Sequence, residues 1–315
     1  MEPYTGNDIF VVAGVDGKIK SNIGDIRDFD KLKGVLDKYR PDIVFHMAAQ
    51  PLVRLSYEQP KLTYDINIGG TVNLLECCRA CDSVNVIINV TSDKCYENKE
   101  WLWGYRENDT LGGYDPYSSS KACSEIITAA YRNSFFNEKK PSLSSVRAGN
   151  VIGGGDWRED RLVPDCIRAL KKGDPVGIRS PGAVRPWQYV LEPLSGYLLL
   201  ASKMYEDCDK YSGAWNFGPY HGSIVSVKEL VTSLIDYWGS GQYEDLSRQS
   251  CQYPHEAGLL MLDISKAINL LNWMPVLNVS EAIEYTMDWY KTSHADYEFC
   301  VNQINDYAEL LARKS

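Results

Sequence analysis

The sequence predicts an α/β fold built on a mostly parallel sheet, and three observations support that prediction. Short apolar runs of strand length alternate along the chain with longer segments of helical periodicity. At 315 residues, the chain is long enough for one large α/β domain or two smaller domains that share an interface. The hydrophobic fraction of 44% and the charged fraction of 24% are ordinary for a globular protein. We therefore expect a parallel sheet with crossover helices packed on its faces.

The predicted strands are apolar runs bounded by polar or turn-forming residues, and they cover residues 18–24, 42–48, 85–90, 142–148 and 214–217. The predicted helices carry apolar residues three and four positions apart, and they cover residues 29–39, 67–79, 118–133, 162–172, 191–205, 227–239, 264–271 and 279–292. Asp28 precedes the first of these helices as its N-cap. Two loops rich in glycine, residues 150–156 and 173–187, are expected to form a site between two domains.

Composition narrows the classes of function. The formal net charge of −9 argues against nucleic acid as the partner, and no apolar run approaches the roughly 18 residues that span a bilayer. The first residues form neither a basic nor an apolar segment, so we expect no signal peptide. Nine scattered cysteines are typical of a reduced cytoplasm, where we expect this protein. Cys77, Cys78 and Cys81 lie in a helical stretch, where we expect packing and no metal site.

The most informative pattern is a tyrosine and a lysine four residues apart at the start of a predicted helix. Tyr117 and Lys121 share one face of that helix, because positions i and i+4 are neighbours. We expect the ammonium of Lys121 to favour the phenolate of Tyr117 and to lower its pKa from the usual value of about 10. Such a tyrosine can exchange a proton with a sugar hydroxyl near neutral pH. Chance alone produces roughly one such pair in a chain of this composition, so the neighbouring motifs decide its meaning.

A second pattern follows the predicted strand at residues 85–90. Ser92, Asp93 and Lys94 are consecutive there, so a hydroxyl, a carboxyl and an amine stand side by side where the strand ends. Six of the fourteen arginines fall between Arg147 and Arg185, which favours a local anion site in a chain of negative net charge. Together, these features indicate proton-transfer chemistry next to an anionic ligand.

The motifs resemble the extended short-chain dehydrogenase/reductase superfamily and, within it, the CDP-glucose 4,6-dehydratases. The resemblance extends over essentially the whole chain and rests on residues 24–28, 45–50, 91–94, 147–151, 161–164, 185–187, 254–258 and 263–266. Lys94 is the discriminating residue, since the dTDP-glucose dehydratases carry Asp-Glu where this sequence has Asp93 and Lys94. Epimerases and simple reductases of the same fold usually lack this ionisable pair, so the pair favours dehydration.

The resemblance implies a Rossmann-type doubly wound sheet with a smaller C-terminal substrate-binding domain. Residues 1–150, with elements from about 185–220, would form the NAD-binding domain, and residues 151–315 would bind the sugar nucleotide. NAD contacts are implied for Asp25, Ile26, Met47, Ala48, Ala49, Tyr117 and Lys121. Substrate contacts are implied for Gln50, Asn150, Arg161, Leu162, Arg185, Asn216 and His255, with the two arginines at the diphosphate.

The resemblance also implies a division of catalytic roles. Hydride would pass from sugar C4 to NAD and later return to C6, so that NAD is not consumed. Tyr117, beside Lys121, would take the proton of the 4-hydroxyl, and Ser92 would hydrogen-bond the same oxygen. Asp93 would protonate the departing 6-hydroxyl, and Lys94, neutral at that moment, would take the C5 proton. The substrate would be CDP-glucose and the product CDP-4-keto-6-deoxyglucose.

Three further interpretations complete the reading of the chain. His46 ends an apolar strand and is expected to pack in the core and to have no catalytic role. The loop residues Trp101, Trp103 and Tyr105 either pack against one another or cover the sugar. The predicted helices at residues 67–79 and 118–133 match those of the superfamily's four-helix dimer interface, so we expect a homodimer.

The sequence departs from the family near its beginning. The Gly-x-x-Gly-x-x-Gly turn that places the NAD pyrophosphate at a helix N-terminus does not occur in the sequence given. The first residues resemble the stretch after the family's second strand, which leaves the predicted strand at residues 42–48 with an open edge. Residues 8–14 are apolar enough for a replacement strand, but the resemblance favours a short helix or loop. The alternatives are a catalytically silent homologue that binds a sugar nucleotide or forms oligomers, or a related epimerase or reductase.

Overall fold

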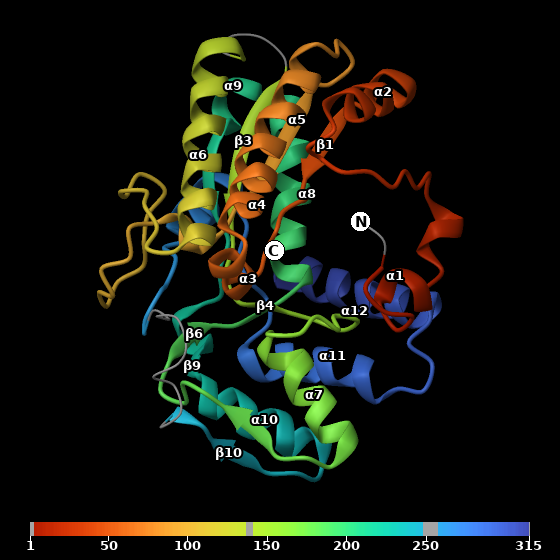
Figure 1. Ribbon diagram of the computed structural model, residues 1–315, viewed down its shortest axis with the longest axis vertical. Helices are drawn as coiled ribbons and strands as arrows, with labels where there is room; N and C mark the ends of the chain where they lie inside the picture. The colour runs from red at the N-terminus through yellow and green to blue at the C-terminus, as the bar shows by residue number, and fades with distance from the viewer. Residues whose placement is uncertain (1–2, 137–140, 248–257, 315) are drawn as a thin grey trace.

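A four-stranded parallel sheet with helices on both faces forms one half of the molecule (Figure 1). The structure is a computed structural model that describes residues 3–136, 141–247 and 258–314. The strand order is β1-β2-β3-β8, and all neighbouring pairs are parallel. These strands are β1 (Ile43–His46), β2 (Val86–Val90), β3 (Ser142–Arg147) and β8 (Gly213–Asn216). The predicted α/β class is confirmed.

The remaining elements are given in chain order. The α-helices are α1 (Ile9–Val12), α2 (Phe29–Tyr39), α3 (Val53–Glu58), α4 (Pro60–Tyr64), α5 (Gly70–Arg79), α6 (Pro116–Phe135), α7 (Leu162–Lys172), α8 (Leu191–Glu206), α9 (Cys208–Tyr211), α10 (Val227–Trp238), α11 (Val279–Lys291) and α12 (Tyr297–Lys314). Short 3-10 or π turns are η1 (Val15–Lys18), η2 (Asp65–Gly69), η3 (Asp93–Cys95), η4 (His221–Ser223) and η6 (Ala267–Leu271). The short strands are β4 (Val151–Ile152), β5 (Val176–Ile178), β6 (Val184–Pro186), β7 (Gln188–Tyr189), β9 (Ile224–Ser226) and β10 (Tyr243–Asp245).

Alternation along β2 separates two apolar cores. Ile87 faces a cluster that α2 and α5 close, together with Leu143 of β3. Val86 and Ile88 face the opposite cluster, which α8 and η6 close. Successive side chains of a strand point to opposite sides, so a strand with apolar residues on both faces must be covered on both faces. The strand predicted at residues 85–90 is confirmed as β2.

A third core holds the other half of the molecule together. The buried faces of α7, α10 and α11 meet there, with Tyr307 of α12 and the short strand β5. Both α10 and α11 begin with capping boxes, in which Ser226 pairs with Glu229 and Asn278 pairs with Glu281. In Figure 1 this half lies below the sheet, and β4 and β7 run between the two halves.

Most predicted elements are confirmed. The two predictions for the first 24 residues have different outcomes. The expected strand at residues 18–24 is wrong: η1 ends at Lys18, and the following residues pair with no strand. Ile19 and Ile23 stay exposed, because β1 is the edge of the sheet and bonds to β2 alone. Residues 9–12 form α1, in agreement with the expected short helix or loop. Helix α12 was not predicted at all.

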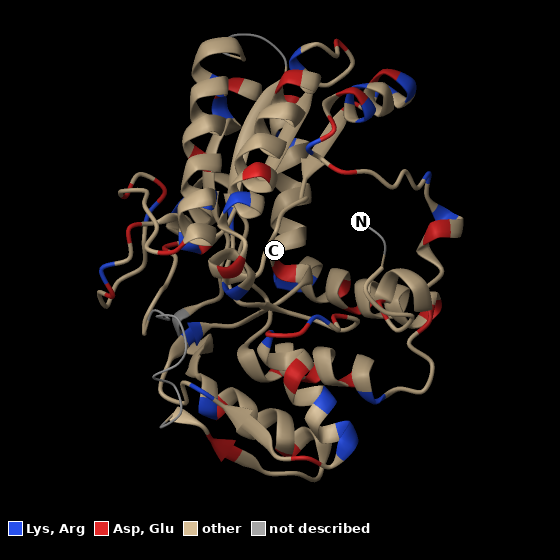
Figure 2. Cartoon of the chain, in the orientation of Figure 1, with Lys and Arg blue, Asp and Glu red and all other residues tan. Residues whose placement is uncertain are grey.

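Acidic and basic residues are distributed over the whole molecule. Figure 2 shows both kinds interspersed along the chain in both halves. Within the described ranges, every helix is too short or too polar to cross a bilayer.

Candidate active site

The catalytic motifs meet at the carboxyl ends of β2 and β3, beside the N-terminus of α6. After β2 ends at Val90, the chain turns into η3, which carries Asp93 and Lys94. Helix α6 begins with Asp115, whose carboxylate accepts the backbone N–H of Ser118 at 2.9 Å, and Pro116 occupies the first turn. This start places Tyr117 in the first turn of α6, directly against η3.

Tyr117 and Lys121 are both buried, and burial dominates their titration. Burial raises the pKa of Tyr117 to about 12, although a hydrogen bond with Ser92 acts in the opposite direction. Burial also lowers the pKa of Lys121 to about 8, and its Nζ donates to the carbonyl oxygen of Val90 at 3.2 Å. The expectation that Lys121 lowers the pKa of Tyr117 is therefore wrong for this structure, because the desolvation of the phenolate outweighs the attraction.

Ser92, Asp93 and Lys94 form a compact group next to Tyr117. The Oγ of Ser92 donates to Asp93 Oδ1 at 3.0 Å and accepts the backbone N–H of Lys94 at 3.2 Å. Lys94 Nζ lies 4.0 Å from Asp93 Oδ1, and 34% of its side chain is exposed. The second carboxylate oxygen of Asp93 is buried without a hydrogen-bond partner among the described residues. An acid, a base and a hydroxyl thus share one corner of the molecule, with one acidic oxygen left for a ligand.

Gly149 makes room for the Asp93 carboxylate. A Cβ at position 149 would lie 1.9 Å from Asp93 Oδ2, a separation that side chains cannot tolerate. Sequence reasoning missed this residue as part of the site. Its position next to Asn150, at the end of a predicted strand, was the available signal.

The residues expected at the sugar nucleotide approach the site from the second half of the molecule. Asn150 has a left-handed backbone (φ 53°), and its Oδ1 is buried without a hydrogen-bond partner among the described residues. Arg161 precedes α7, pairs with Asp156 at 2.8 Å and is near enough to act electrostatically on Tyr117. Arg185 donates to the carbonyl oxygens of Val184 and Gly258. Leu162 packs against the third core.

Two other expected substrate contacts, Gln50 and Asn216, are not brought to this corner as free groups. The side chain of Gln50 is buried and bonded to Leu52 and Thr63. Asn216 is buried, and its amide donates to the carbonyl oxygens of Tyr105 and Asp263. Ligand contacts by Gln50 and Asn216 stay predictions, and either contact would require existing hydrogen bonds to open. His255 lies outside the described residues.

The residues expected at the cofactor fit a dinucleotide in part. Met47 and Ala48 are exposed where β1 ends, at the edge of the sheet where ligands of this fold class bind. Ala49 is half-buried beside them. Asp25 is exposed and held by Arg27 at 2.6 Å, while Ile26 packs so closely on α5 that it excludes a Cβ from position 70.

These placements suit the reactive and adenine ends of the dinucleotide. Tyr117 lies near enough to Asp93 for the carboxyl to act on it electrostatically, and Lys121 is one turn further along α6. In the described part of the chain, neither β1 nor β2 is followed by a glycine-rich turn. Contacts to the pyrophosphate are therefore left unassigned.

The residues with open interpretations resolve as packing groups. His46 is buried, its Nε2 lies 3.1 Å from Thr71 Oγ1, and burial lowers its pKa to about 3, as expected for a packed histidine. Trp101 and Tyr105 pack in one cluster with ring centroids 5.1 Å apart and planes tilted by 33°, whereas Trp103 is largely exposed. The three helical cysteines, Cys77, Cys78 and Cys81, lie in the core beneath α5.

Two cavities complete the description of this region. One of about 20 Å³ lies beside the site, between Gly149, Gln188 and Met261, and it is large enough for a single water molecule. Another, of about 490 Å³, lies between Tyr220, Met274 and Lys314 and contains none of the expected site residues. Chemistry therefore locates the active site better than cavity size does.

Comparison with known proteins identifies the family of this chain. The family model for GDP-mannose 4,6 dehydratase matches residues 11–286. The CDP-glucose 4,6-dehydratase of Salmonella typhimurium is 46% identical over 313 residues, which cover 97% of this chain and 87% of that protein. The CDP-paratose 2-epimerase of Salmonella typhi is 27% identical and covers 84% of this chain and 82% of that protein.

Solved structures agree in fold. The Thermus thermophilus UDP-glucose 4-epimerase, solved with NAD, superposes with a TM-score of 0.72 at 25% identity, covering 86% of this chain and 84% of that one. The Bacillus anthracis dTDP-glucose 4,6-dehydratase, also solved with NAD, has a TM-score of 0.71 at 21% identity, covering 86% of this chain and 79% of that one. These folds are Rossmann-type, as the sequence predicted. Given the family match and the identity to the Salmonella dehydratase, the chain belongs to the GDP-mannose 4,6-dehydratase family.

Proposed function

We propose that this chain is a CDP-glucose 4,6-dehydratase, an NAD-dependent lyase that forms CDP-4-keto-6-deoxyglucose. The observation that carries the proposal is the meeting of Asp93 and Lys94 with the buried pair Tyr117 and Lys121. An epimerase or reductase needs the second pair alone, whereas elimination of water also needs an acid and a base. The 46% identity to a CDP-glucose dehydratase supports the same reaction and the same nucleotide base, cytosine, in the substrate.

The buried pair serves the oxidation of C4. Met47, Ala48, Ala49, Tyr117 and Lys121 are the residues proposed to hold NAD, which when bound would supply the hydride acceptor for C4 and the hydride donor for C6. Tyr117 takes the proton of the 4-hydroxyl, and its hydrogen bond with Ser92 holds it toward that oxygen. Lys121, one turn along α6, donates from Nζ to the carbonyl oxygen of Val90 and is proposed to hold the cofactor beside Tyr117.

Asp93 and Lys94 serve the loss of water. A ketone at C4 acidifies the C5 proton, which Lys94 takes in its neutral form, and the C5–C6 double bond forms as the C6–oxygen bond breaks. Asp93 gives its proton to the departing 6-hydroxyl, so that water leaves. When hydride reaches C6, a proton returns to C5, so the sugar has lost only the elements of water and gained a carbonyl. The unpartnered Oδ2 of Asp93 is the oxygen available for this transfer.

The second half of the molecule is proposed to hold the sugar nucleotide. Arg161 and Arg185 offer planar guanidinium groups for the diphosphate, and Asn150 offers its free Oδ1 near the sugar. On this basis, residues 1–150 with elements from about 185–220 form the NAD-binding domain, and residues 151–315 bind the sugar nucleotide. The eight cysteines within the described ranges are free thiols, which supports a reduced, cytoplasmic setting.

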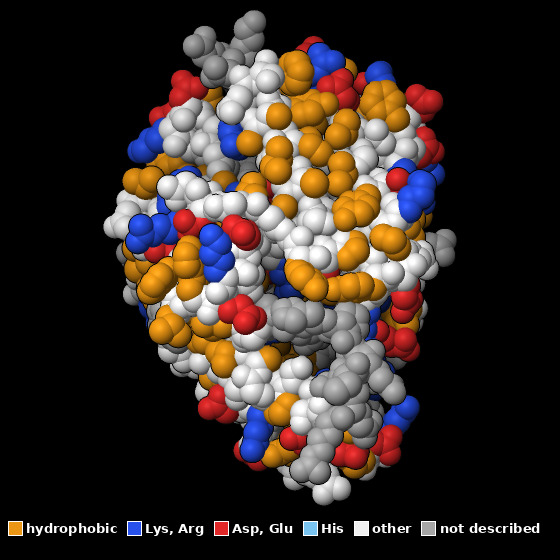
Figure 3. Space-filling view, turned by 60° about the vertical axis from the view of Figure 1, so that its left-hand side comes forward, with side chains coloured by type: hydrophobic (Ala, Val, Ile, Leu, Met, Phe, Trp, Pro, Cys, Tyr) orange, Lys and Arg blue, Asp and Glu red, His pale blue; other side chains and the backbone are white. Residues whose placement is uncertain are grey.

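We also propose that the protein is a homodimer. Helices α5 and α6 lie side by side on one face of the sheet (Figure 1). Figure 3 shows hydrophobic side chains gathered over the upper part of the face that comes forward when the left side of Figure 1 is turned toward the viewer. Ile126 and Phe135 of α6 are each more than half exposed. Light scattering is expected to give the mass of two chains, and a monomer at all concentrations would contradict this proposal.

NAD binding followed by turnover tests the main proposal. Purified protein is titrated with NAD in a calorimeter and then incubated with CDP-glucose, with dTDP-glucose and GDP-glucose as matched alternatives. We expect saturable binding and a product 18 mass units lighter than CDP-glucose, formed fastest from the cytidine nucleotide, since loss of water is the reaction proposed. A product of unchanged mass would indicate an epimerase.

A silent homologue is the second candidate. It would keep the proposed contacts to the sugar nucleotide, Asn150, Arg161 and Arg185, without turnover. A folded protein that binds CDP-glucose, does not bind NAD and releases no product would establish this candidate and contradict the main proposal.

A further inference from the structure

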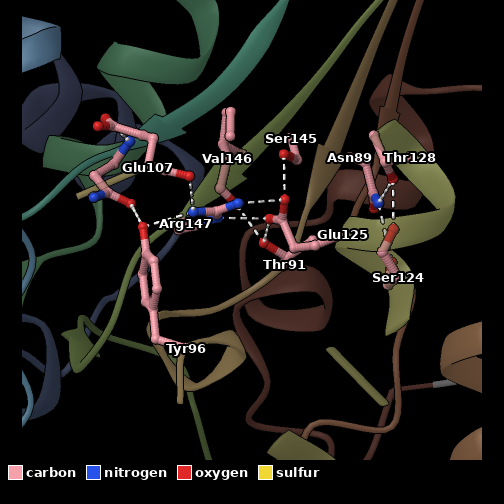
Figure 4. A network of polar contacts seen from close by, with 12 residues as sticks. Asn89, Thr91, Tyr96, Glu107, Ser124, Glu125, Thr128, Ser145, Val146 and Arg147 are labelled. Carbon is pink, nitrogen blue, oxygen red and sulfur yellow. Dashed lines mark hydrogen bonds and ion pairs between the residues drawn. The ribbon is translucent and has the colours of Figure 1, made fainter. Parts of the chain in front are cut away.

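A buried ion pair between Glu125 and Arg147 lies at the centre of a polar network that includes Thr91, Tyr96 and Ser145 (Figure 4). Arg147, the last residue of β3, donates from Nη2 to Glu125 Oε2 at 2.7 Å and from Nε to Glu125 Oε1 at 2.9 Å. Only 3% of either side chain is exposed. The two bonds are parallel and bidentate, which is the strongest arrangement for this pair of groups.

The same two side chains hold neighbouring segments of the chain. Glu125 also accepts hydrogen bonds from the hydroxyls of Thr91 and Ser145. The Nη1 of Arg147 donates to Tyr96 Oη at 2.6 Å and to the carbonyl oxygen of Glu107 at 3.0 Å. Thus one ion pair joins α6 to the ends of β2 and β3 and to the loop that follows η3 (Figure 4).

The Glu125–Arg147 pair connects to Lys121 by two routes. Glu125 lies one turn after Lys121 on α6, so both project from the same face of the helix. Lys121 Nζ is bonded to the carbonyl oxygen of Val90, and the next residue, Thr91, is bonded to Glu125. The carboxylate therefore holds both the helix that carries Lys121 and the strand end to which Lys121 is bonded. Ser92 follows immediately.

Stability alone is a weak explanation for this arrangement. Two charges removed from water lose several kcal/mol of hydration each, and well-packed apolar side chains often stabilise a core equally well. The loss of hydration free energy is explained if the charge and the geometry of the ion pair serve the reaction.

We propose that Glu125 and Arg147 are positioning residues, which hold Lys121 in register with residues 91–93 and supply the negative charge that faces Lys121. The proposal deepens the proposed dehydratase function and rests on it for the role of Lys121. Neither residue contacts the reacting atoms. Their effect passes through Lys121 and through the segment that carries Ser92 and Asp93.

The charges around Lys121 give this effect a definite sign. Glu125 on α6 raises the pKa of Lys121 against the larger lowering by burial. The other facing groups are neutral at pH 7: Tyr117 on α6, Cys95 on η3 and His46 on β1 have pKa values that burial moves away from neutrality. Arg147 is paired with Glu125. Removal of the Glu125 charge ends the attraction and leaves Arg147 without its counter-ion, so we expect the pKa of Lys121 to fall.

The test is a direct titration of Lys121 in the protein without added cofactor. Lysine side chains are labelled with carbon-13 at Cε, the Lys121 signal is assigned by its loss in Lys121→Met, and its midpoint is followed by NMR. In Glu125→Gln, which keeps the shape of the side chain, we expect the midpoint to fall by about one pH unit or more. Glu192→Gln is the matched control, because Glu192 is a buried carboxylate that binds the N–H groups of Val276 and Leu277 and does not act on Lys121.

The outcomes separate this proposal from the proposed function. A midpoint in folded Glu125→Gln within about 0.3 units of the unaltered protein would overturn the positioning role, whatever the turnover. Where turnover is present, its alkaline limb is expected to move to lower pH in Glu125→Gln and to stay in place in Glu192→Gln. If Glu125→Gln does not fold, Glu125→Gln/Arg147→Met removes both charges and leaves no unpaired buried ion. The midpoint is expected to fall there as well, by less, and an unchanged midpoint would again overturn the proposal.

Discussion

The carboxyl ends of β2 and β3 differ from the edge strand β1 in how many of their polar groups are hydrogen-bonded within the protein. Behind the active site, Glu125 and Arg147 bind every neighbouring segment and are fully enclosed. At β1, Ile43 and Met47 are exposed, and the strand bonds on one side alone. Ile19 and Ile23 are exposed nearby, where a further strand was predicted.

The difference teaches where rigidity is needed for the proposed reaction. Proton transfers require donors and acceptors held within hydrogen-bond reach, and the enclosed region supplies this from side chains alone. A cofactor brings its own surface, so the region that receives it can remain open until binding. The following predictions test this contrast between an enclosed catalytic corner and an open edge, from the largest expected effect to the smallest.

Loss of the phenol hydroxyl is expected to have the largest effect. Tyr117→Phe should lower the rate of CDP-glucose dehydration by about 10²–10⁴-fold, because no other group can take the 4-hydroxyl proton. Product formation is measured by mass spectrometry. Tyr131→Phe is the control: its hydroxyl bonds to Glu76 at 2.8 Å near the far end of the same helix, and its rate should be unchanged. Equal rates in both variants would remove Tyr117 from the mechanism.

Removal of the proposed base should separate oxidation from elimination. Lys94→Ala is expected to lower product formation by about 10²-fold or more while hydride transfer from C4 continues. Transfer is followed with CDP-glucose that carries deuterium at C4, by the appearance of the label in the nicotinamide. Lys99→Ala, an exposed lysine in the adjoining loop, is the control. If deuterium transfer stops in Lys94→Ala as completely as in Tyr117→Phe, the proposed division of roles is incorrect.

A single added methyl group should show how tightly the catalytic corner is enclosed. Gly149→Ala places a Cβ 1.9 Å from Asp93 Oδ2, so the acid must move. We expect turnover to fall by about tenfold to 10²-fold, with a loss of about 1–3 kcal/mol in the free energy of unfolding. Gly34→Ala, in α2 with open space at its Cβ, should leave turnover unchanged and stabilise the fold slightly. An unaltered rate in Gly149→Ala would show that the carboxylate tolerates displacement.

The end of β1 should respond to acid through His46. Its pKa is lowered from 6.5 to about 3 in the folded protein, so the unfolded chain binds a proton below pH 6.5 that the folded protein does not bind. This contribution therefore destabilises the fold increasingly as the pH falls from 6.5 toward 3, by about 2–3 kcal/mol at pH 4.5. His46→Gln should remove that part of the pH dependence in urea unfolding at pH 7 and 4.5. The exposed His294→Gln should retain it, and identical slopes for the two variants would refute the assignment.

Much of the catalytic corner could be predicted because its signals are local. Tyr117 and Lys121 are one helical turn apart, and Ser92 to Lys94 follow a strand that is apolar on both faces. Glu125 was missed, although its position one turn after Lys121 on the buried face of α6 was a usable signal. The pKa of Tyr117 was predicted in the wrong direction, since the pattern shows the neighbouring charge and does not show the extent of burial.

The sequence by itself determined the α/β class, the boundaries of most helices and the order of the catalytic residues, because periodicity, capping and short spacings act over a few residues. Tertiary structure alone decided what depends on distant segments. It left residues 18–24 without a strand partner, placed Gly149 against Asp93, and enclosed Glu125 with Arg147. Burial and backbone pairing bring together residues that are far apart in the chain. Their energies depend on which residues become neighbours, and a local sequence pattern does not contain that information.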